Sequence, residues 1–411
     1  MKTTTVKDVR KLNRSLILKE FYFNGPVTRL DVSRVTKLSP ATVTNIVTDL
    51  LENGVLVEEG NVESSGGRPS VLLKVNPDLG YFIGVEIGES HIQTELFDIY
   101  FSKTTQYAIN DLELDLSPEH LIDLVADSIG QVLRSANLKE TDILGIGLGL
   151  PGIVDPESGI SIFSPSWGWN NINLSELLRR KIAIPIYIDN GAKALSVAEL
   201  LFGQGQGVDE FAVLLIGAGV GGAIVHNDLL LRGGSNSAGE IGHMTLSIDG
   251  PVCRCGSKGC FEAFIGANHI FEEFGRTKDE PQPRLENREL MKKIFSNYSN
   301  PDSKERKIIQ NSIQYLGAGI ANLINIENPE RIILGGWLGI LYGEADLDLI
   351  KNVVKKYALA QSYELVDICV SNLGAEAIPM GSAAMALIDF FENVNQEDLM
   401  VIGGNRLKQR N

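Results

Sequence analysis

Cysteine is scarce in this sequence: its 411 residues include four cysteines and five histidines. Three of the cysteines nevertheless fall within eight residues, and a histidine precedes them by ten positions. Three thiolates and an imidazole form the Cys₃His set that tetrahedral structural zinc prefers, and the glycines between them suit a tight knuckle. The alternatives are buried thiols beside an unrelated histidine, or a disulfide, which a cytosolic chain disfavours. The predicted zinc ligands, one ion per chain, are His243, Cys253, Cys255 and Cys260.

Long apolar runs are also missing. No run reaches the roughly 18 residues that a membrane helix needs, and the first ten residues alternate charged with apolar types instead of forming a secretion signal. The sequence therefore predicts a cytoplasmic protein with no membrane partner. A chain of 411 residues is long enough for two or three domains.

Basic residues are fewer than acidic ones, which gives the chain a net charge of −15, but the difference is not spread evenly along the sequence. Residues 1–75 contain 11 Lys and Arg against 8 Asp and Glu, whereas the remainder contains 26 against 44. A mildly basic segment joined to an acidic body fits a small nucleic-acid-binding module attached to a part that repels DNA.

The first 75 residues predict three helices and a two-stranded ribbon. Apolar spacing indicates a helix over 13–23. Thr28 and Asp31 form a capping box for a second helix, and Ser39-Pro40 starts a third. Strands are expected at 55–57 and 71–75. This is the order of a winged helix-turn-helix, although a three-helix cap with no role in DNA binding has the same pattern.

Two features favour the DNA-binding interpretation. The third helix begins with small polar residues that can enter a major groove. The ribbon tip, Gly66-Gly67-Arg68-Pro69, presents an arginine suited to a narrow, A·T-rich minor groove. The predicted DNA-binding residues are Ser39, Ala41, Thr42, Thr44, Asn45 and Arg68.

From Tyr81 onward, strands and helices follow one another in an α/β pattern. Glycine-turned hairpins are predicted at 81–97 and 211–225, with further strands at 143–150, 186–189, 331–335 and 365–370 and a helix near 312–325. Two such hairpins, each followed by helices and strands, suggest a duplicated domain with a ligand cleft between its lobes. The stretch 275–286 is predicted to be a surface loop.

The Gly-Leu-Pro-Gly turn at 149–152, the Glu-Ile-Gly-His motif at 240–243, the cysteine knuckle and the N-terminal helices together resemble the ROK family, and in particular its xylose-repressor-like branch. The resemblance covers nearly the whole chain. It implies a two-lobed actin/hexokinase-like (ribonuclease-H-like) domain behind a winged helix-turn-helix. It also implies a sugar site whose hydroxyl-binding residues are Asn190, Glu240, His243 and Glu262.

Departures from the kinases of this family indicate a regulator instead of an enzyme. Gly191 stands where the kinases have the carboxylate that deprotonates the sugar, a base that contributes about 10²–10⁴-fold. On the nucleotide side, Glu89 would repel phosphates, Ala218 replaces a threonine, and Trp337 replaces a glycine. No catalytic residue is therefore expected. Two other interpretations stay open: a sugar kinase with an atypical base, and a repressor whose sugar pocket is vestigial, as a serine at 166 in place of the family's asparagine suggests.

The resulting expectation is a sugar-responsive repressor of carbohydrate-utilisation genes that binds a palindromic operator as a homodimer or tetramer, because one winged helix covers too few bases. Its DNA-binding domain is expected at 1–78 and its sugar-binding domain at 79–411. The first lobe would comprise about 79–190 plus the C-terminal helix, and the second lobe about 191–378. The sequence leaves open the identity of the sugar, the operator, and whether the sugar induces or co-represses. Trp167 and Trp169 either stack on a sugar or belong to the core.

Overall fold

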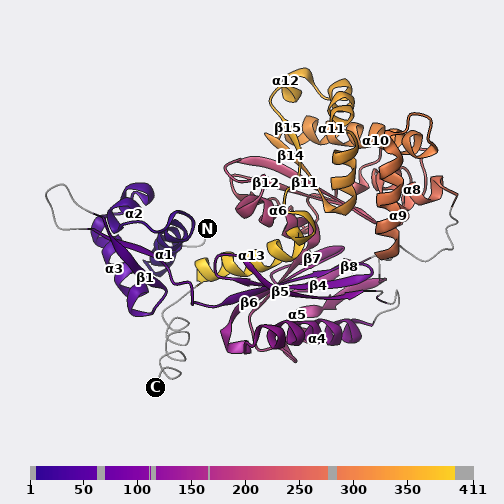
Figure 1. The fold of residues 1–411 in the computed structure, drawn as a ribbon. Helices are drawn as coiled ribbons and strands as arrows, with labels where there is room; N and C mark the ends of the chain where they lie inside the picture. Colours follow the sequence, from indigo (N-terminus) through magenta and orange to yellow (C-terminus); the bar gives the residue numbers. More distant parts are fainter. Residues whose placement is uncertain are drawn as a thin grey trace.

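The computed structural model describes residues 6–62, 70–110, 112, 117–164, 167–275 and 285–393. The N-terminal part contains the elements in the predicted order (Figure 1). They are α1 (Val6–Asn24), α2 (Arg29–Thr36), α3 (Pro40–Glu52), β1 (Leu56–Val62) and β2 (Ser70–Val75).

Local signals in the sequence set the ends of these helices. The Thr28 hydroxyl accepts from the Asp31 amide, and the Asp31 carboxylate accepts from the Thr28 amide, so the predicted capping box is present. The Ser39 hydroxyl likewise accepts from the Thr42 amide at 3.1 Å and caps α3. Helix α1 begins earlier than predicted, because Arg10 and Lys11 propagate a helix well without showing a hydrophobic period.

The body contains two five-stranded sheets with the same strand pattern. The orders are β10-β6-β3-β4-β5 and β13-β12-β11-β14-β15. In each sheet, the first strand of a hairpin is followed on one side by two strands parallel to it, and the second strand of the hairpin pairs with a third antiparallel strand at the other edge. The strands of the first sheet are β3 (Tyr81–Ile87), β4 (His91–Asp98), β5 (Lys103–Asn110), β6 (Ile143–Leu150) and β10 (Ile186–Asn190). Those of the second are β11 (Glu210–Ile216), β12 (Val220–His226), β13 (Leu229–Leu230), β14 (Arg331–Gly335) and β15 (Asp367–Val370).

The remaining strands and helices complete the two lobes. A small antiparallel sheet contains β7 (Ile153–Asp155), β8 (Ile160–Ser164) and β9 (Trp169–Asn173). The longer helices are α4 (Pro118–Ala136), α6 (Gly191–Phe202), α9 (Leu285–Ser296), α10 (Lys304–Glu327), α11 (Gly336–Tyr357) and α13 (Ala377–Asn393). The short ones are α5 (Leu174–Arg179), α7 (Glu262–Ile265), α8 (Ala267–Glu273), α12 (Ala360–Tyr363) and the 3₁₀ turns η1 (Glu140–Asp142), η2 (Ile241–His243), η3 (Asn297–Ser299) and η4 (Gly374–Glu376).

Alternate residues of β11 serve two different cores. Ala212, Leu214 and Ile216 are buried in the cluster that also contains α10 and α11, whereas Phe211 and Val213 are buried with residues of α6 and α13. A strand covered by helices on both faces has no polar face, which explains the uninterrupted apolar run in the sequence. The two-lobed α/β architecture predicted from the sequence is confirmed.

Helix α13 connects the parts of the molecule. Figure 1 shows it, in yellow, lying between the two large sheets with one end toward the N-terminal helices. It lies close to β3 and β6 because both strands carry glycines. A Cβ on Gly84 would stand 1.8 Å from the Pro379 carbonyl oxygen, and one on Gly147 1.7 Å from that of Ser382. At its far end, the ring of Phe391 packs edge-on against Tyr22 of α1, 5.0 Å between centroids.

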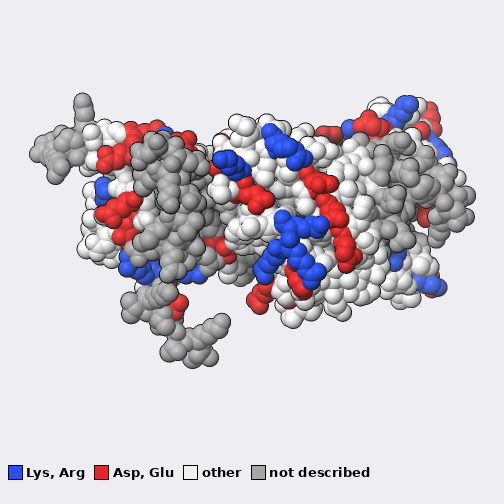
Figure 2. All heavy atoms as spheres, turned by 90° about the horizontal axis from the view of Figure 1, so that it is seen from below, with Lys and Arg blue, Asp and Glu red and all other residues white. Residues whose placement is uncertain are grey.

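On the face shown in Figure 2, Lys and Arg are mixed with Asp and Glu over the body of the molecule, so this face does not present charge of a single sign.

Among the helices that the structure describes, none is long and apolar enough to cross a membrane.

Candidate functional site

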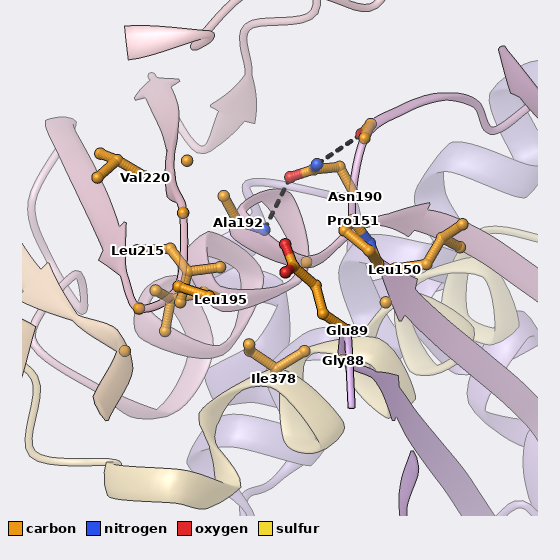
Figure 3. A pocket seen from close by; sticks show the side chains of 18 of the residues that line it. Gly88, Glu89, Leu150, Pro151, Asn190, Ala192, Leu195, Leu215, Val220 and Ile378 are labelled. Atoms are coloured by element: carbon orange, nitrogen blue, oxygen red, sulfur yellow. Dashed lines mark hydrogen bonds between the residues drawn. The ribbon is translucent and has the colours of Figure 1, made fainter. Parts of the chain in front are cut away.

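A cavity of about 330 Å³ lies between the lobes. The first lobe contributes the turn after β3 and the Pro151-Gly152 turn, and the start of α6 lines the cavity at the boundary between the lobes. The second contributes the β11–β12 turn, the cysteine knuckle, α9 and the start of α11. In Figure 3 the Glu89 carboxylate points toward Ala192, and Leu195, Leu215 and Ile378 line an apolar side. The four residues expected to contact sugar, Asn190, Glu240, His243 and Glu262, all line this one cavity.

Asn190 is held rigidly at the end of β10, where α6 begins. Its amide nitrogen donates to the Gly152 carbonyl at 2.6 Å, and its amide oxygen accepts from the Ala192 backbone at 2.8 Å (Figure 3). The preceding residue, Asp189, is 1% exposed and pairs with Arg232 of the second lobe at 2.7 Å. Asn190 therefore lies next to an ion pair that joins the lobes, and its own side chain lines the cavity.

The structure brings the four predicted zinc ligands together. One ligand atom from each of His243, Cys253, Cys255 and Cys260 lies within 4.8 Å of every other. The Cys255 and Cys260 sulfurs are 3.8 Å apart, as is the Cys253 sulfur from His243 Nδ1. Two sulfurs that each lie about 2.3 Å from a tetrahedral zinc are separated by about 3.8 Å, so the donor set fits this ion. Binding through Nδ1 leaves Nε2 of His243 as the nitrogen available to the cavity.

The backbone of the knuckle shapes this cluster. Val252 pairs with Lys258 and Thr245 with Cys260 through isolated bridges. Gly259 has a φ of +70°, and a Cβ there would stand 1.6 Å from the Ser247 carbonyl oxygen. Only glycine satisfies both constraints, so the turn that brings Cys260 back toward Cys255 depends on it.

Glu262 is already bonded on both oxygens. It accepts from the Val220 amide at 2.8 Å and from Arg254, whose Nε and Nη2 lie 2.8 and 3.2 Å from the two carboxylate oxygens. The Cys253 sulfur lies 3.4 Å from it. The structure places Glu262, which the resemblance implies as a sugar ligand, in a bidentate ion pair at the cavity wall. Its contact with a sugar stays a prediction.

Glu240 differs from Glu262 in its hydrogen bonding. Within the described residues, no protein group donates a hydrogen bond to the Glu240 carboxylate. Burial raises the pKa of Glu240, and nearby His243 and Lys193 only partly oppose this. Lys193 is itself 2% exposed and donates to the Asn236 carbonyl. A partly desolvated carboxylate with unused acceptor capacity facing a cavity is suited to binding hydroxyl groups.

The nucleotide-side turn, residues 217–222, is occupied by side chains. A Cβ on Gly217 would stand 2.9 Å from Nε1 of Trp337, and one on Gly219 1.9 Å from Nη2 of Arg254. The indole and the guanidinium therefore lie directly on this turn. Arg288 stands over the Trp337 ring, 5.7 Å from its centroid.

Glu89 has a partner that the sequence analysis missed. Arg254 donates to its carboxylate from the opposite lobe. Burial by itself would lower the pKa of the Arg254 guanidinium. The negative charges of Glu89 and Glu262 have the larger effect, so the pKa of this guanidinium is raised. Arg254 lies in the sequence between the predicted zinc ligands Cys253 and Cys255. That position was the signal from which a role for Arg254 at the site could have been predicted.

Trp167 and Trp169 belong to the core of the first lobe. Their rings lie 4.8 Å apart, Trp169 is 6% exposed, and both pack with the buried cluster that includes α4. Neither lines the cavity, so the stacking interpretation is wrong for this cavity as the structure has it.

The residues expected to read DNA gather at the start of α3. Ser39, Ala41, Thr44 and Asn45 are exposed, and Thr42 is half-buried. The hydroxyls of Ser39 and Thr42 bond each other at 2.9 Å. Among the described residues, the side chains of Thr44 and Asn45 have no hydrogen-bond partner, and the methyl group of Ala41 is exposed beside them. Arg68 lies outside the described residues.

Comparisons with known proteins found similar sequences and similar structures. A model of the ROK family matches residues 82–388. The chain is 32% identical over 387 residues to a xylose repressor of Caldicellulosiruptor bescii, with 93% of this chain and 96% of that protein covered.

Two solved structures are similar in fold. A ROK family transcriptional regulator described as a homologue of the E. coli MLC protein matches with a TM-score of 0.80 at 25% identity, covering 97% of this chain and 100% of that one. A ROK family glucokinase from Streptomyces griseus, solved with glucose and AMPPNP, matches with a TM-score of 0.65 at 24% identity, covering 75% of this chain and 99% of that one.

Proposed function

Because this chain belongs to the ROK family, we propose that it is a sugar-responsive transcriptional repressor of carbohydrate-utilisation genes and has no kinase activity. The observation that carries the proposal is the asymmetry of the cavity. Its sugar side presents Glu240, His243 and the fixed amide of Asn190, whereas its nucleotide-side turn is covered by Trp337 and Arg254. Gly191, at the position of the kinase base, offers no group that can accept a proton.

The extent of the similarity supports a regulator. The xylose repressor aligns with 93% of the chain, whereas the glucokinase covers 75%. The ROK family model begins at residue 82, so the three N-terminal helices and the ribbon lie outside the part that it matches. We assign residues 1–78 to DNA binding and residues 79–411 to sugar binding.

Operator binding would use the exposed start of α3 in a major groove, with Ala41, Thr44 and Asn45 nearest the bases and Ser39 and Thr42 stabilising the helix end. Arg68 on the ribbon would enter an adjacent A·T-rich minor groove. A homodimer on a palindromic operator in the cytoplasm supplies the specificity that a single winged helix lacks.

The packing of helices between the cavity and the N-terminal domain supports a connection between the two functions. Helix α6 begins at Gly191 in the cavity wall and packs along α13, and α13 reaches α1 through the contact between Phe391 and Tyr22. A sugar that binds one arrangement of the lobes better than the other would shift α6 and α13, and with them the N-terminal helices.

One zinc ion per chain would be held by His243, Cys253, Cys255 and Cys260. When bound, it supplies a rigid tetrahedral crosslink and no redox chemistry. With zinc bound, the backbone turn at Gly259 and the four ligands would hold His243 and Glu262 at a fixed distance from each other on the cavity wall.

A sugar panel tests the proposal. Thermal shift identifies a ligand, since a sugar at 100 times its Kd stabilises by about 2.7 kcal/mol, and the same sugar is then added to the protein–operator complex. We expect sugar-dependent change in operator affinity and no ATP consumption with any sugar. ATP turnover would support a kinase with an unusual base, and a sugar-independent operator complex would support a vestigial pocket.

A further inference from the structure

Arg254 joins the two lobes across the mouth of the cavity. It lies in the knuckle of the second lobe and contacts Glu262 of the same lobe through two nitrogens, Nε at 2.8 Å and Nη2 at 3.2 Å. Its remaining terminal nitrogen, Nη1, donates to Glu89, in the turn between β3 and β4 of the first lobe. One guanidinium thus satisfies two carboxylates from opposite sides of the cleft.

The surroundings of Arg254 fit this bridging position. Its side chain is 28% exposed, and those of Glu89 and Glu262 are 15% and 7% exposed. Gly219 makes room for it, since a Cβ there would stand 1.9 Å from Nη2. Charges this shielded interact more strongly than surface pairs.

Loss of Arg254 would affect the two carboxylates differently. Glu262 keeps the Val220 amide as a donor if Arg254 leaves, so the second lobe tolerates the loss. Among the described ion pairs, two others also join the lobes, Arg232–Asp189 and Lys103–Glu376. The pair of Arg254 with Glu89 is the one of these three whose residues line the cavity. Opening of the cleft must therefore break the contact between Arg254 and Glu89.

We propose that Arg254 is a positioning residue that holds the lobes closed by bridging Glu89 and Glu262, so that the sugar binds the arrangement that this bridge stabilises. The inference rests on the proposed sugar site and assigns its regulation. Arg254 touches the protein's own carboxylates, and its effect on the sugar acts through the lobe arrangement and through Glu262.

The test uses Glu89→Gln, Arg254→Met and the double variant of the full-length, zinc-loaded protein. Sugar affinity is measured by calorimetry with the ligand found in the thermal-shift panel. We expect each single variant to bind the sugar at least about fivefold more weakly than the parent protein. The double variant should bind it no more weakly than Arg254→Met, because both substitutions remove the same contact between Arg254 and Glu89. Glu89→Gln leaves the knuckle sequence intact, and zinc content is measured for every variant.

A second readout needs no sugar. Hydrogen exchange of peptides spanning 217–222, in the lobe opposite Glu89, should become faster in Glu89→Gln because the cleft opens more often. Arg331→Met is the matched control, since it breaks an ion pair with Asp367 within the second lobe, 3.1 Å between Nε and Oδ2, and should leave that exchange unchanged.

The two proposals fail differently. Unchanged hydrogen exchange at 217–222 in Glu89→Gln would overturn the proposed bridge. Tighter sugar binding by Arg254→Met would also overturn it, because Arg254 would then only compete with the sugar for Glu262. If no sugar binds the parent protein but exchange still rises in Glu89→Gln, the bridge stands and the sugar site is wrong.

Discussion

Replacing Glu240 with glutamine should weaken the response to sugar more clearly than any other single change in the cavity. Among the described residues, no protein group donates to this carboxylate, although burial has already raised its pKa. Its acceptor capacity is therefore available to a ligand. Glu262, by contrast, is bonded to Arg254 and to the Val220 amide.

The size of the effect follows from the bond that is lost. A hydrogen bond to a charged group contributes about 1.5–3 kcal/mol, and every 1.4 kcal/mol is tenfold in affinity. Glutamine keeps the shape but replaces one acceptor oxygen with a donor, which faces a hydroxyl that is already donating. We expect sugar affinity to fall by at least about tenfold and by roughly a hundredfold if one bond is lost fully.

The measurement is sugar-dependent release of a labelled operator fragment, with sugar affinity from calorimetry as the direct check. Glu289→Gln is the control: it removes the same charge from α9, where the side chain is 72% exposed and pairs only locally with Lys292. The parent and control should respond at the same sugar concentration, and Glu240→Gln should need at least about tenfold more. An unchanged response in Glu240→Gln would mean that the ligand binds elsewhere.

Three further predictions follow from other parts of the chain. Cys255→Ser should lower zinc content, measured by elemental analysis, and the melting temperature, because a structural zinc site contributes directly to folding; full zinc content would exclude Cys255 as a ligand. Burial raises the pKa of Glu95 to about 7, from 4.5 when unfolded, so its proton is lost from the folded state as pH rises through this window and the parent protein is destabilised. Glu95→Gln should therefore stabilise the protein at pH 8 by up to ~3 kcal/mol and lose that advantage near pH 4, which urea unfolding at both pH values checks. Arg68→Ala should weaken operator binding, more for A·T-rich flanks than for G·C-rich ones; equal loss on both would make Arg68 an ordinary phosphate contact.

Local signals in the sequence were enough for the elements whose ends depend on neighbouring residues. The capping box at Thr28 and the Ser39-Pro40 start set α2 and α3 as expected, because a cap is made by residues three positions apart. The knuckle was predictable for the same reason: Cys253, Cys255 and Cys260 are close in sequence, and a short chain with glycine turns must bring them together.

The state of each carboxylate in the cavity depended on tertiary structure. The sequence treated Glu240 and Glu262 as equivalent and Glu89 as a free negative charge, because nothing local distinguishes them. Folding places Arg254 between Glu89 and Glu262, which are 165 and 8 residues away from it in the chain, and leaves Glu240 unpaired among the described residues. Ion pairing depends on separation in space, and for groups in opposite lobes only the packing of the lobes sets that separation.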